Sequence, residues 1–289
     1  MQYPSFTKTR LAPTPSGYLH LGNAYSFLLT AALAKRHGAK ILLRIDDIDR
    51  GRTRDAYVTD IFDSLAFLQV EWDEGPKTAT DFHQHFSQYL RMPLYETLLQ
   101  RLVATGRVYA CGCSRKQLAE QGGHDAVSCR ARQLPLDTPD VAWRIDTDNA
   151  GPISVRMLDG TTRIGHLEAG TSDFIIRKRD GGPAYQIASL ADDLYFGVDL
   201  IVRGDDLWTS TLSQLFLARL LGEQGFLDAT FHHHGLLTDD TNRKLSKSEG
   251  ATSLRYLRER SAGLDVIYNM CKSEVQRGLN PDNVDNVFD

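Results

Sequence analysis

The chain has 289 residues, of which 42% are hydrophobic and 24% are charged, and its formal net charge is −4 at pH 7. This composition is typical of a globular protein with a large core, in one large domain or two modest ones. No apolar run reaches the roughly 18–20 residues that a membrane helix needs, and the N-terminus lacks the apolar core of a signal peptide. We therefore expect a cytoplasmic protein without a membrane segment.

The first hundred residues alternate between strand and helix patterns. Strand patterns occupy residues 7–13 (TKTRLAP) and 40–45 (KILLRI). Helix patterns occupy residues 23–37, capped by Asn23, then 55–70 and 92–105. This alternation predicts a parallel α/β sheet.

The middle of the chain has a different character, and the α/β pattern resumes after it. Residues 106–184 contain turns, three cysteines and short β-like pieces, which indicate an inserted subdomain. Helix patterns follow at 184–197 and 210–222, and strand patterns at 199–204 and 230–237. We expect a catalytic domain at 1–252 with a Rossmann-like parallel sheet, interrupted by the insert, and a short helical tail at 253–289.

A glycine and a histidine stand where the first helix begins. The segment RLAPTPSGYLHLGN, residues 10–23, places His20 and Gly22 after a proline-rich turn. A helix start presents backbone N–H groups and a partial positive charge, and a glycine lets a phosphate come close. The segment can be an anion cradle with His20 as an added donor, or a turn with a surface histidine.

A second polar segment, NRKLSKSEG at residues 242–250, contains Lys244 and Lys247. Two lysines in a polar loop suit a polyphosphate whose charge rises during a reaction. The alternative is an exposed lysine loop.

Together these segments resemble the paired signatures of the class I aminoacyl-tRNA synthetases. LLRIDDID, AYQIASLADD and VRGDDLWTSTLSQLFL are similar to the glutamyl-tRNA synthetase branch. The resemblance implies that ATP and Mg²⁺ activate L-glutamate as an adenylate, with His20, Lys244 and Lys247 stabilising the transition state. It also implies an ATP site that contains His20, Gly22, Asn23, Leu237 and Lys247, although Leu237 can equally be a core leucine.

The same resemblance implies a site for the amino acid. Its expected residues are Arg10, Thr14, Asp46, Tyr185 and Arg203. Two arginines suit the side-chain carboxylate of glutamate, since each offers paired donors. Asp46 stands where this branch usually has a glutamate that binds the substrate amino group, and it reaches roughly 1.5 Å less far, which bears on positioning.

Three cysteines lie close together in the insert, at Cys111, Cys113 and Cys129, and Cys271 stands apart as a structural residue. In a reducing compartment such a cluster indicates a metal site more than disulfides. Zn²⁺ takes four ligands, and His124 or Asp125 can be the fourth. The alternative is three buried thiols. The run His232–His234 lies in a predicted strand, where consecutive side chains face opposite ways, so we expect no metal there.

Two basic runs are candidates for local nucleic-acid contact on this acidic protein. They are SCRARQ at residues 128–133 and RKRDGG at residues 177–182. Runs of this kind are more often solvated loops.

Only about 40 residues follow the lysine segment, so we expect no anticodon-binding domain. This resembles a stand-alone family of the branch that attaches glutamate to the queuosine base of tRNA(Asp). We expect a monomer whose substrates, besides ATP, are L-glutamate and tRNA(Asp) that carries queuosine. The alternatives are an adenylating ligase with a non-tRNA acceptor, a truncated glutamyl-tRNA synthetase and a non-catalytic binding module.

Overall fold

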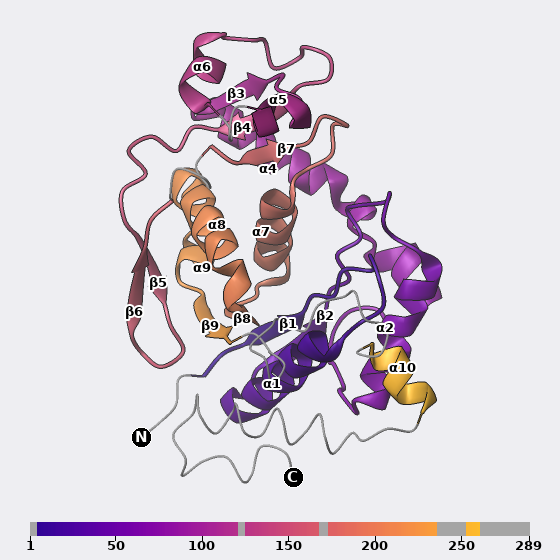
Figure 1. The fold of residues 1–289 in the computed structure, drawn as a ribbon. Helices are drawn as coiled ribbons and strands as arrows, with labels where there is room; N and C mark the ends of the chain where they lie inside the picture. Colours follow the sequence, from indigo (N-terminus) through magenta and orange to yellow (C-terminus); the bar gives the residue numbers. More distant parts are fainter. Residues whose placement is uncertain (1–4, 121–124, 168–172, 236–252, 261–289) are drawn as a thin grey trace. The chain divides into compact units, whose positions relative to one another are not determined.

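The computed structural model describes residues 5–120, 125–167, 173–235 and 253–260 (Figure 1). The chain divides into two compact units. The first unit comprises Met1–Leu90, Val198–Asp206 and Thr230–Asp289, and the second comprises Arg91–Gly197 and Leu207–Ala229. Within the described ranges, no helix has the length and apolar character needed to cross a bilayer.

The first unit is built on two pairs of parallel strands. Strand β1 (Lys8–Leu11) pairs with β2 (Lys40–Leu43), and β8 (Leu200–Gly204) pairs with β9 (Thr230–His234). β1 and β8 lie side by side, and the Asp199 backbone N–H donates to the Lys8 carbonyl at 3.1 Å. Helix α1 (Leu21–His37) packs against this layer (Figure 1). The expected mixture of parallel strands and helices is therefore confirmed in this unit.

The N-cap of helix α1 lies three residues before the predicted position. Its N-cap is His20 and not Asn23, so that prediction was wrong. The His20 ring accepts from the Gly22 backbone N–H, and the Asn23 side chain accepts from the His20 backbone N–H. This reciprocal pair is a capping box in which histidine replaces the usual Ser or Thr. The helix ends as predicted at Gly38, whose φ of 68° suits glycine.

The remaining helices of the first unit follow β2. They are α2 (Asp55–Phe67), a short turn α3 (Ala79–Asp81) and a π-helical turn η1 (Phe82–Phe86). Helix α10 (Leu254–Glu259) packs on α2, where Arg258 forms an ion pair of 2.9 Å with the buried Asp60.

Gly75 fixes the segment beside β2. Its φ is 100°, and a Cβ at this position would lie 2.2 Å from the Leu43 carbonyl oxygen. Glycine is therefore the residue that the close backbone approach permits.

The second unit has a helical half and an antiparallel half. The helices are α4 (Met92–Ala104), α7 (Tyr185–Phe196), α8 (Trp208–Leu221) and α9 (Gln224–Leu227), preceded by the 3-10 turns η2 (Gln88–Arg91) and η3 (Asp205–Leu207). Asp192 of α7 is fully buried and accepts two bonds from Arg91, at 2.7 and 2.9 Å, and one from the Tyr95 hydroxyl at 2.8 Å. This carboxylate joins α7 to the start of α4.

The strands of the second unit are all antiparallel. One sheet has the order β3 (Val108–Cys111), β4 (Ala142–Ile145) and β7 (Ile175–Arg177), and a hairpin joins β5 (Ile153–Arg156) to β6 (Thr162–Gly165). Short helices α5 (Arg115–Glu120) and α6 (Ala126–Ala131) lie between β3 and β4 in sequence. The unit contains the predicted insert, residues 106–184, together with the four helices named above, so its boundaries differ from those of the insert.

Candidate active site and thiol cluster

Several predicted site residues gather at one edge of the first unit. Arg10 lies near the end of β1, Arg203 near the end of β8, and Asp46 shortly after β2. In parallel sheets the carboxyl ends of the strands share one edge, where ligands of such folds bind. Both guanidinium groups are buried, and Arg10 Nη1 donates to the Val202 carbonyl at 3.0 Å. The topology therefore brings these two arginines onto neighbouring strands.

His20 is held in one orientation at the start of α1. Its Nδ1 accepts from the Gly22 N–H at 3.1 Å, so the neutral ring carries its proton on Nε2. A Cβ at position 22 would lie 3.0 Å from His20 Cε1. Glycine thus keeps the imidazole seated on the helix end. At this helix start the Gly22 N–H is therefore donated to the His20 ring.

The chain returns to His20 directly after the lysine segment. Ser253 forms an antiparallel bridge with His20, and the Leu254 N–H donates to the Leu19 carbonyl at 2.8 Å. Lys244, Lys247 and Leu237 lie outside the described residues, so their predicted roles stay predictions.

Asp46 has a partner that the sequence analysis missed. Its two carboxylate oxygens accept from Arg44 Nε at 2.8 Å and Nη2 at 2.9 Å, and both side chains are buried. Arg44 and Asp46 are two residues apart in an extended segment, where such residues share a face. That spacing was the available signal. The carboxylate predicted to bind an amino group is therefore already paired with a guanidinium.

The loop after β2 is fixed by the next carboxylate. Asp47 accepts from the Ser87 hydroxyl at 2.6 Å and the Gln88 N–H at 2.8 Å, and the Gln88 side chain accepts from the Ile48 N–H. These bonds hold the loop that carries Asp46.

Two further residues predicted for the amino-acid site are exposed. Thr14 lies in the loop after β1 in the first unit. Tyr185 begins α7 in the second unit and is 38% exposed. The role of Tyr185 beside Arg10 and Arg203 stays a prediction.

The three predicted cysteines of the insert come together in the second unit. Cys111 ends β3, Cys113 follows it, and Cys129 lies on α6, with all three buried. Cys129 Sγ lies 3.8 Å from Cys111 Sγ and 3.2 Å from Cys113 Sγ. Among the residues that the structure describes, this thiol triad is the one group arranged to hold a metal ion, and His232–His234 form none.

The triad fits zinc in the number and type of its ligands. A tetrahedral site with Zn–S bonds of about 2.3 Å has sulfur–sulfur edges of about 3.8 Å. The Cys111–Cys129 distance equals that edge, and the Cys113–Cys129 distance is shorter. Binding would require Cys113 and Cys129 to separate by about half an ångström.

Of the two candidate fourth ligands, the structure describes Asp125. Asp125 caps α6 by accepting from the Ser128 N–H at 3.1 Å, and its carboxylate is not within the group formed by the three sulfurs. His124 and Cys271 lie outside the described residues.

Burial and nearby charges give the thiols of Cys111 and Cys129 different pKa values. Burial raises the pKa of Cys129 to about 12, with further contributions from the Cys113 thiol and the Cys111 charge. Burial acts in the same direction on Cys111, but the Cys113 backbone N–H and the Arg144 guanidinium outweigh it and lower the pKa of this thiol. Of these two thiols, Cys111 is therefore the more acidic.

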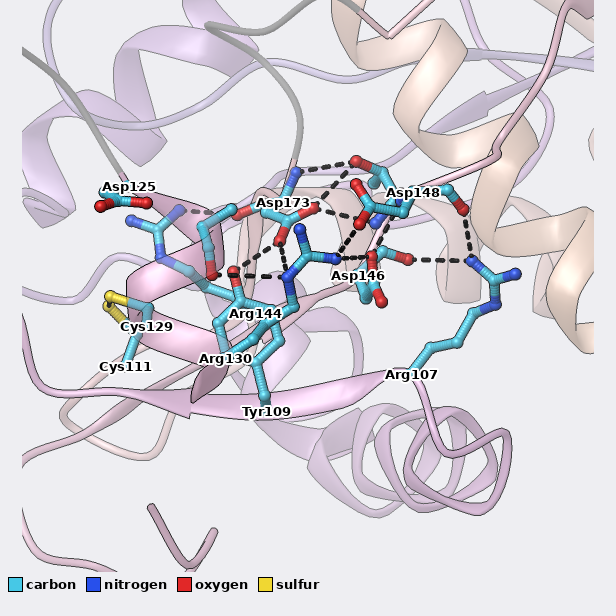
Figure 2. Close-up of polar contacts among 12 residues, drawn as sticks. Arg107, Tyr109, Cys111, Asp125, Cys129, Arg130, Arg144, Asp146, Asp148 and Asp173 are labelled. Carbon is cyan, nitrogen blue, oxygen red and sulfur yellow. Dashed lines mark hydrogen bonds and ion pairs between the residues drawn. The ribbon is translucent and has the colours of Figure 1, made fainter. Parts of the chain in front are cut away.

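A network of ion pairs fixes α6 against the sheet (Figure 2). Arg130, next to Cys129, pairs with Asp146, with Asp148 at 2.6 Å and with Asp173 at 3.6 Å. The buried Asp173 also accepts from the Tyr109 hydroxyl at 2.7 Å. Burial, and then the Asp173 carboxylate, raise the pKa of Tyr109, so its hydroxyl stays a donor. Arg130 therefore has a structural role.

Comparison with protein families identifies one match over nearly the whole chain. Residues 7–288 match the model described as tRNA synthetases class I (E and Q), catalytic domain.

Two kinds of curated relatives are similar to the chain. A Glutamyl-Q tRNA(Asp) synthetase of Rhodobacter capsulatus is 32% identical over 89% of this chain and 97% of that protein, and one of Symbiobacterium thermophilum is 35% identical over 86% and 80%. Glutamate–tRNA ligase 2 of Syntrophus aciditrophicus is 32% identical over 91% of this chain. The chain spans 56% of that ligase, or about half its length.

A solved structure supports the fold. A glutamate tRNA ligase of Elizabethkingia meningosepticum, in complex with its amino acid, superposes with a TM-score of 0.69 at 22% identity. The match covers 85% of this chain and 53% of that one.

Proposed function

The chain belongs to the class I aminoacyl-tRNA synthetases of the glutamate and glutamine branch, and on that premise we propose that it activates glutamate with ATP and transfers it to the queuosine base of tRNA(Asp). The observation that carries the activation step is the shared strand edge. Arg10 and Arg203 lie there on neighbouring strands, in the same unit as the helix start that His20 caps.

The proposed activation needs positioned charge more than proton transfer. An oxygen of the α-carboxylate of glutamate attacks the α-phosphorus of ATP. The new bond joins this oxygen to the phosphorus, and the bond between the α-phosphorus and the leaving pyrophosphate breaks. No base is required, because the carboxylate is already ionised. His20 donates from Nε2 to a phosphate oxygen at a helix start that itself favours anions. Mg²⁺ supplied with ATP would offset the negative charge of the phosphates.

We assign amino-acid recognition to the buried arginines. The guanidinium groups of Arg10 and Arg203 bind the side-chain carboxylate of glutamate, and glutamine is rejected because it lacks the charge. Asp46 binds the substrate ammonium while it also accepts from Arg44. Thr14 of the first unit belongs to the same proposed site, and a role for Tyr185 is implied by the sequence resemblance alone.

The lysine segment completes the proposed phosphate site. Ser253 lies six positions after Lys247 and is bridged to His20. In this proposal Lys244 and Lys247 stabilise the charge that develops on the phosphates, with Gly22, Asn23 and Leu237 against the nucleotide.

We also assign a zinc ion to the thiol triad, with Asp125 or His124 as the fourth ligand. Three converging buried thiols support this assignment. A bound zinc would join β3 to α6 and supply folding free energy.

The acceptor rests on the length of the relatives. The Rhodobacter capsulatus protein aligns over 97% of its length, which favours the queuosine base as acceptor. A hydroxyl of that base would attack the activated carboxyl carbon, forming an ester and releasing AMP. The similar identity to glutamate–tRNA ligase 2 supports a second candidate, transfer to tRNA(Glu).

The deciding experiment has two stages. ATP–pyrophosphate exchange is measured for glutamate, glutamine and aspartate, first without tRNA and then with tRNA(Glu). Labelled glutamate is then offered to tRNA(Asp) with queuosine, the same tRNA with guanine instead, and tRNA(Glu). We expect exchange with glutamate alone and transfer only to the queuosine-bearing tRNA.

Other outcomes would replace the proposal. Exchange that appears only with tRNA(Glu) would support the second candidate. Exchange without transfer to any tRNA would indicate a ligase with another acceptor. Absence of exchange under all these conditions would leave a binding module.

A further inference from the structure

We propose that Arg132, Arg144 and Arg179 form a charge-compensating layer around the thiol triad, and that Arg132 tunes its affinity for zinc. The inference rests on the proposed zinc centre, because such a layer acts only where the sulfurs bind as thiolates. Two of these arginines come from the basic runs that the sequence offers as nucleic-acid contacts or solvated loops.

Cys113 is contacted by both of these runs. Arg132, the C-cap residue of α6, places Nη1 3.8 Å from Cys113 Sγ. Arg179, from the second run, donates from Nη2 to the Cys113 carbonyl at 2.5 Å. One contact acts on the sulfur and the other fixes the backbone that carries it.

Cys111 is approached by an arginine of the neighbouring strand. Arg144 on β4 stands directly across from Tyr109 on β3. Because side chains alternate along a strand, Tyr109 and Cys111 share a face, and Arg144 lies on that same face. The side chain of Arg144 is buried on the face that carries Cys111, where a guanidinium can offset the charge of a metal-bound sulfur.

The arginines can balance the net negative charge of a zinc ion bound by three thiolates. Three thiolates and one Zn²⁺ sum to one negative charge, and an aspartate as fourth ligand adds a second. A buried charge is costly unless it is paired, and the arginine guanidinium stays charged at any physiological pH. Groups just outside the ligands typically change metal affinity by about 10- to 100-fold.

Arg130 shows that this arrangement is selective. It belongs to the same basic run and precedes Arg132 by two residues, but its guanidinium pairs with Asp146, Asp148 and Asp173. Of the two arginines in this run, Arg130 therefore pairs with carboxylates and Arg132 contacts the sulfur.

The test measures zinc affinity of the full chain by competition with a chromophoric chelator, at fixed ionic strength. Arg132→Met removes the charge, Arg132→Lys keeps it, and Arg156→Met is the control, since Arg156 of the same unit pairs with the exposed Asp228. Arg132 is exposed, so we expect all variants to fold, which thermal unfolding of the zinc-loaded proteins verifies. We expect Arg132→Met to weaken zinc binding by about 10- to 100-fold, Arg132→Lys to weaken it less, and Arg156→Met to have no effect.

A spectroscopic measurement separates tuning of the sulfur from simple support of α6. With Co²⁺ in place of zinc, the sulfur-to-cobalt charge-transfer band of Arg132→Met is expected to shift relative to that of the unmodified chain. Equal zinc affinities and an unshifted band would overturn this inference and leave the zinc centre intact. Failure of the unmodified chain to bind zinc would instead overturn the zinc centre itself, and the layer with it.

Discussion

The two units both bury arginines, but the fold gives these residues different surroundings. In the first unit, Arg10 and Arg203 lie near the carboxyl ends of adjacent parallel strands, where Arg10 contacts a backbone carbonyl and Arg203 lies 5.8 Å from the Phe231 ring centroid. In the second unit, Arg91 is joined to the carboxylate of Asp192 by two bonds. The comparison teaches that a buried arginine joined to a carboxylate, as Arg44 also is in the first unit, is a structural cation, whereas Arg10 and Arg203 at the strand ends are ligand candidates.

The largest effect is expected at Asp192, where the proposed structural role of Arg91 can be tested directly. Asp192→Asn leaves the Arg91 charge without its carboxylate in a buried site, which typically costs about 3–5 kcal/mol of stability. Urea unfolding, followed by circular dichroism, measures the loss. A variant within about 1 kcal/mol of the unmodified chain would show that the pair is not a structural element of the second unit.

His20 tests the first unit. His20→Ala removes a proposed donor to the transition state, and we expect kcat for ATP–pyrophosphate exchange to fall by about 10²- to 10³-fold while the fold is retained. His85→Ala, which alters an exposed histidine of the same unit, is the matched control. Near-normal exchange by the His20 variant would contradict its assignment.

Arg203 sharpens the distinction between the two kinds of arginine. Arg203→Met should cost about 1.5–3 kcal/mol of binding to the glutamate carboxylate, which is roughly a 10- to 150-fold higher KM for glutamate. The KM for ATP should change little. An unchanged glutamate KM would place Arg203 among the structural cations.

The smallest effect is expected at the surface of the second unit. Asp228→Asn breaks an ion pair of 3.1 Å between two half-exposed side chains. Such pairs contribute about 0–1 kcal/mol, so urea unfolding should differ little from that of the unmodified chain. A loss comparable to that of Asp192→Asn would mean that burial does not govern these pairs.

Local patterns in the sequence predicted much of the fold. The strands β1, β2, β8 and β9 appear where apolar β-rich runs predict them, because strand and helix periodicities are set within a few residues. The thiol triad was equally readable from the spacing of Cys111, Cys113 and Cys129. The helix cap was misplaced because histidine is an uncommon cap, and its ring here takes the acceptor role that Asn23 was expected to supply.

Other features depend on contacts that spacing does not reveal. Arg44 could have been paired with Asp46 from their separation of two residues in an extended segment. The partners of Arg130 and Arg132 depend on the register of β3 on β4 and on the position of α6. A run of basic residues in the sequence reveals neither of these. Gly75 gave no sign of its approach to Leu43, since its φ depends on a distant backbone.

The bridge between His20 and Ser253 matters to anyone who trims this chain. A truncation that stops ahead of Ser253 would discard α10 and strip Asp60, a buried carboxylate, of the guanidinium of Arg258. The cut would also remove the backbone partner of Leu19, the residue before His20. A shortened fragment intended only to omit the C-terminal segment would therefore disturb the opposite end of the polypeptide, and sensible cloning boundaries lie beyond Arg260.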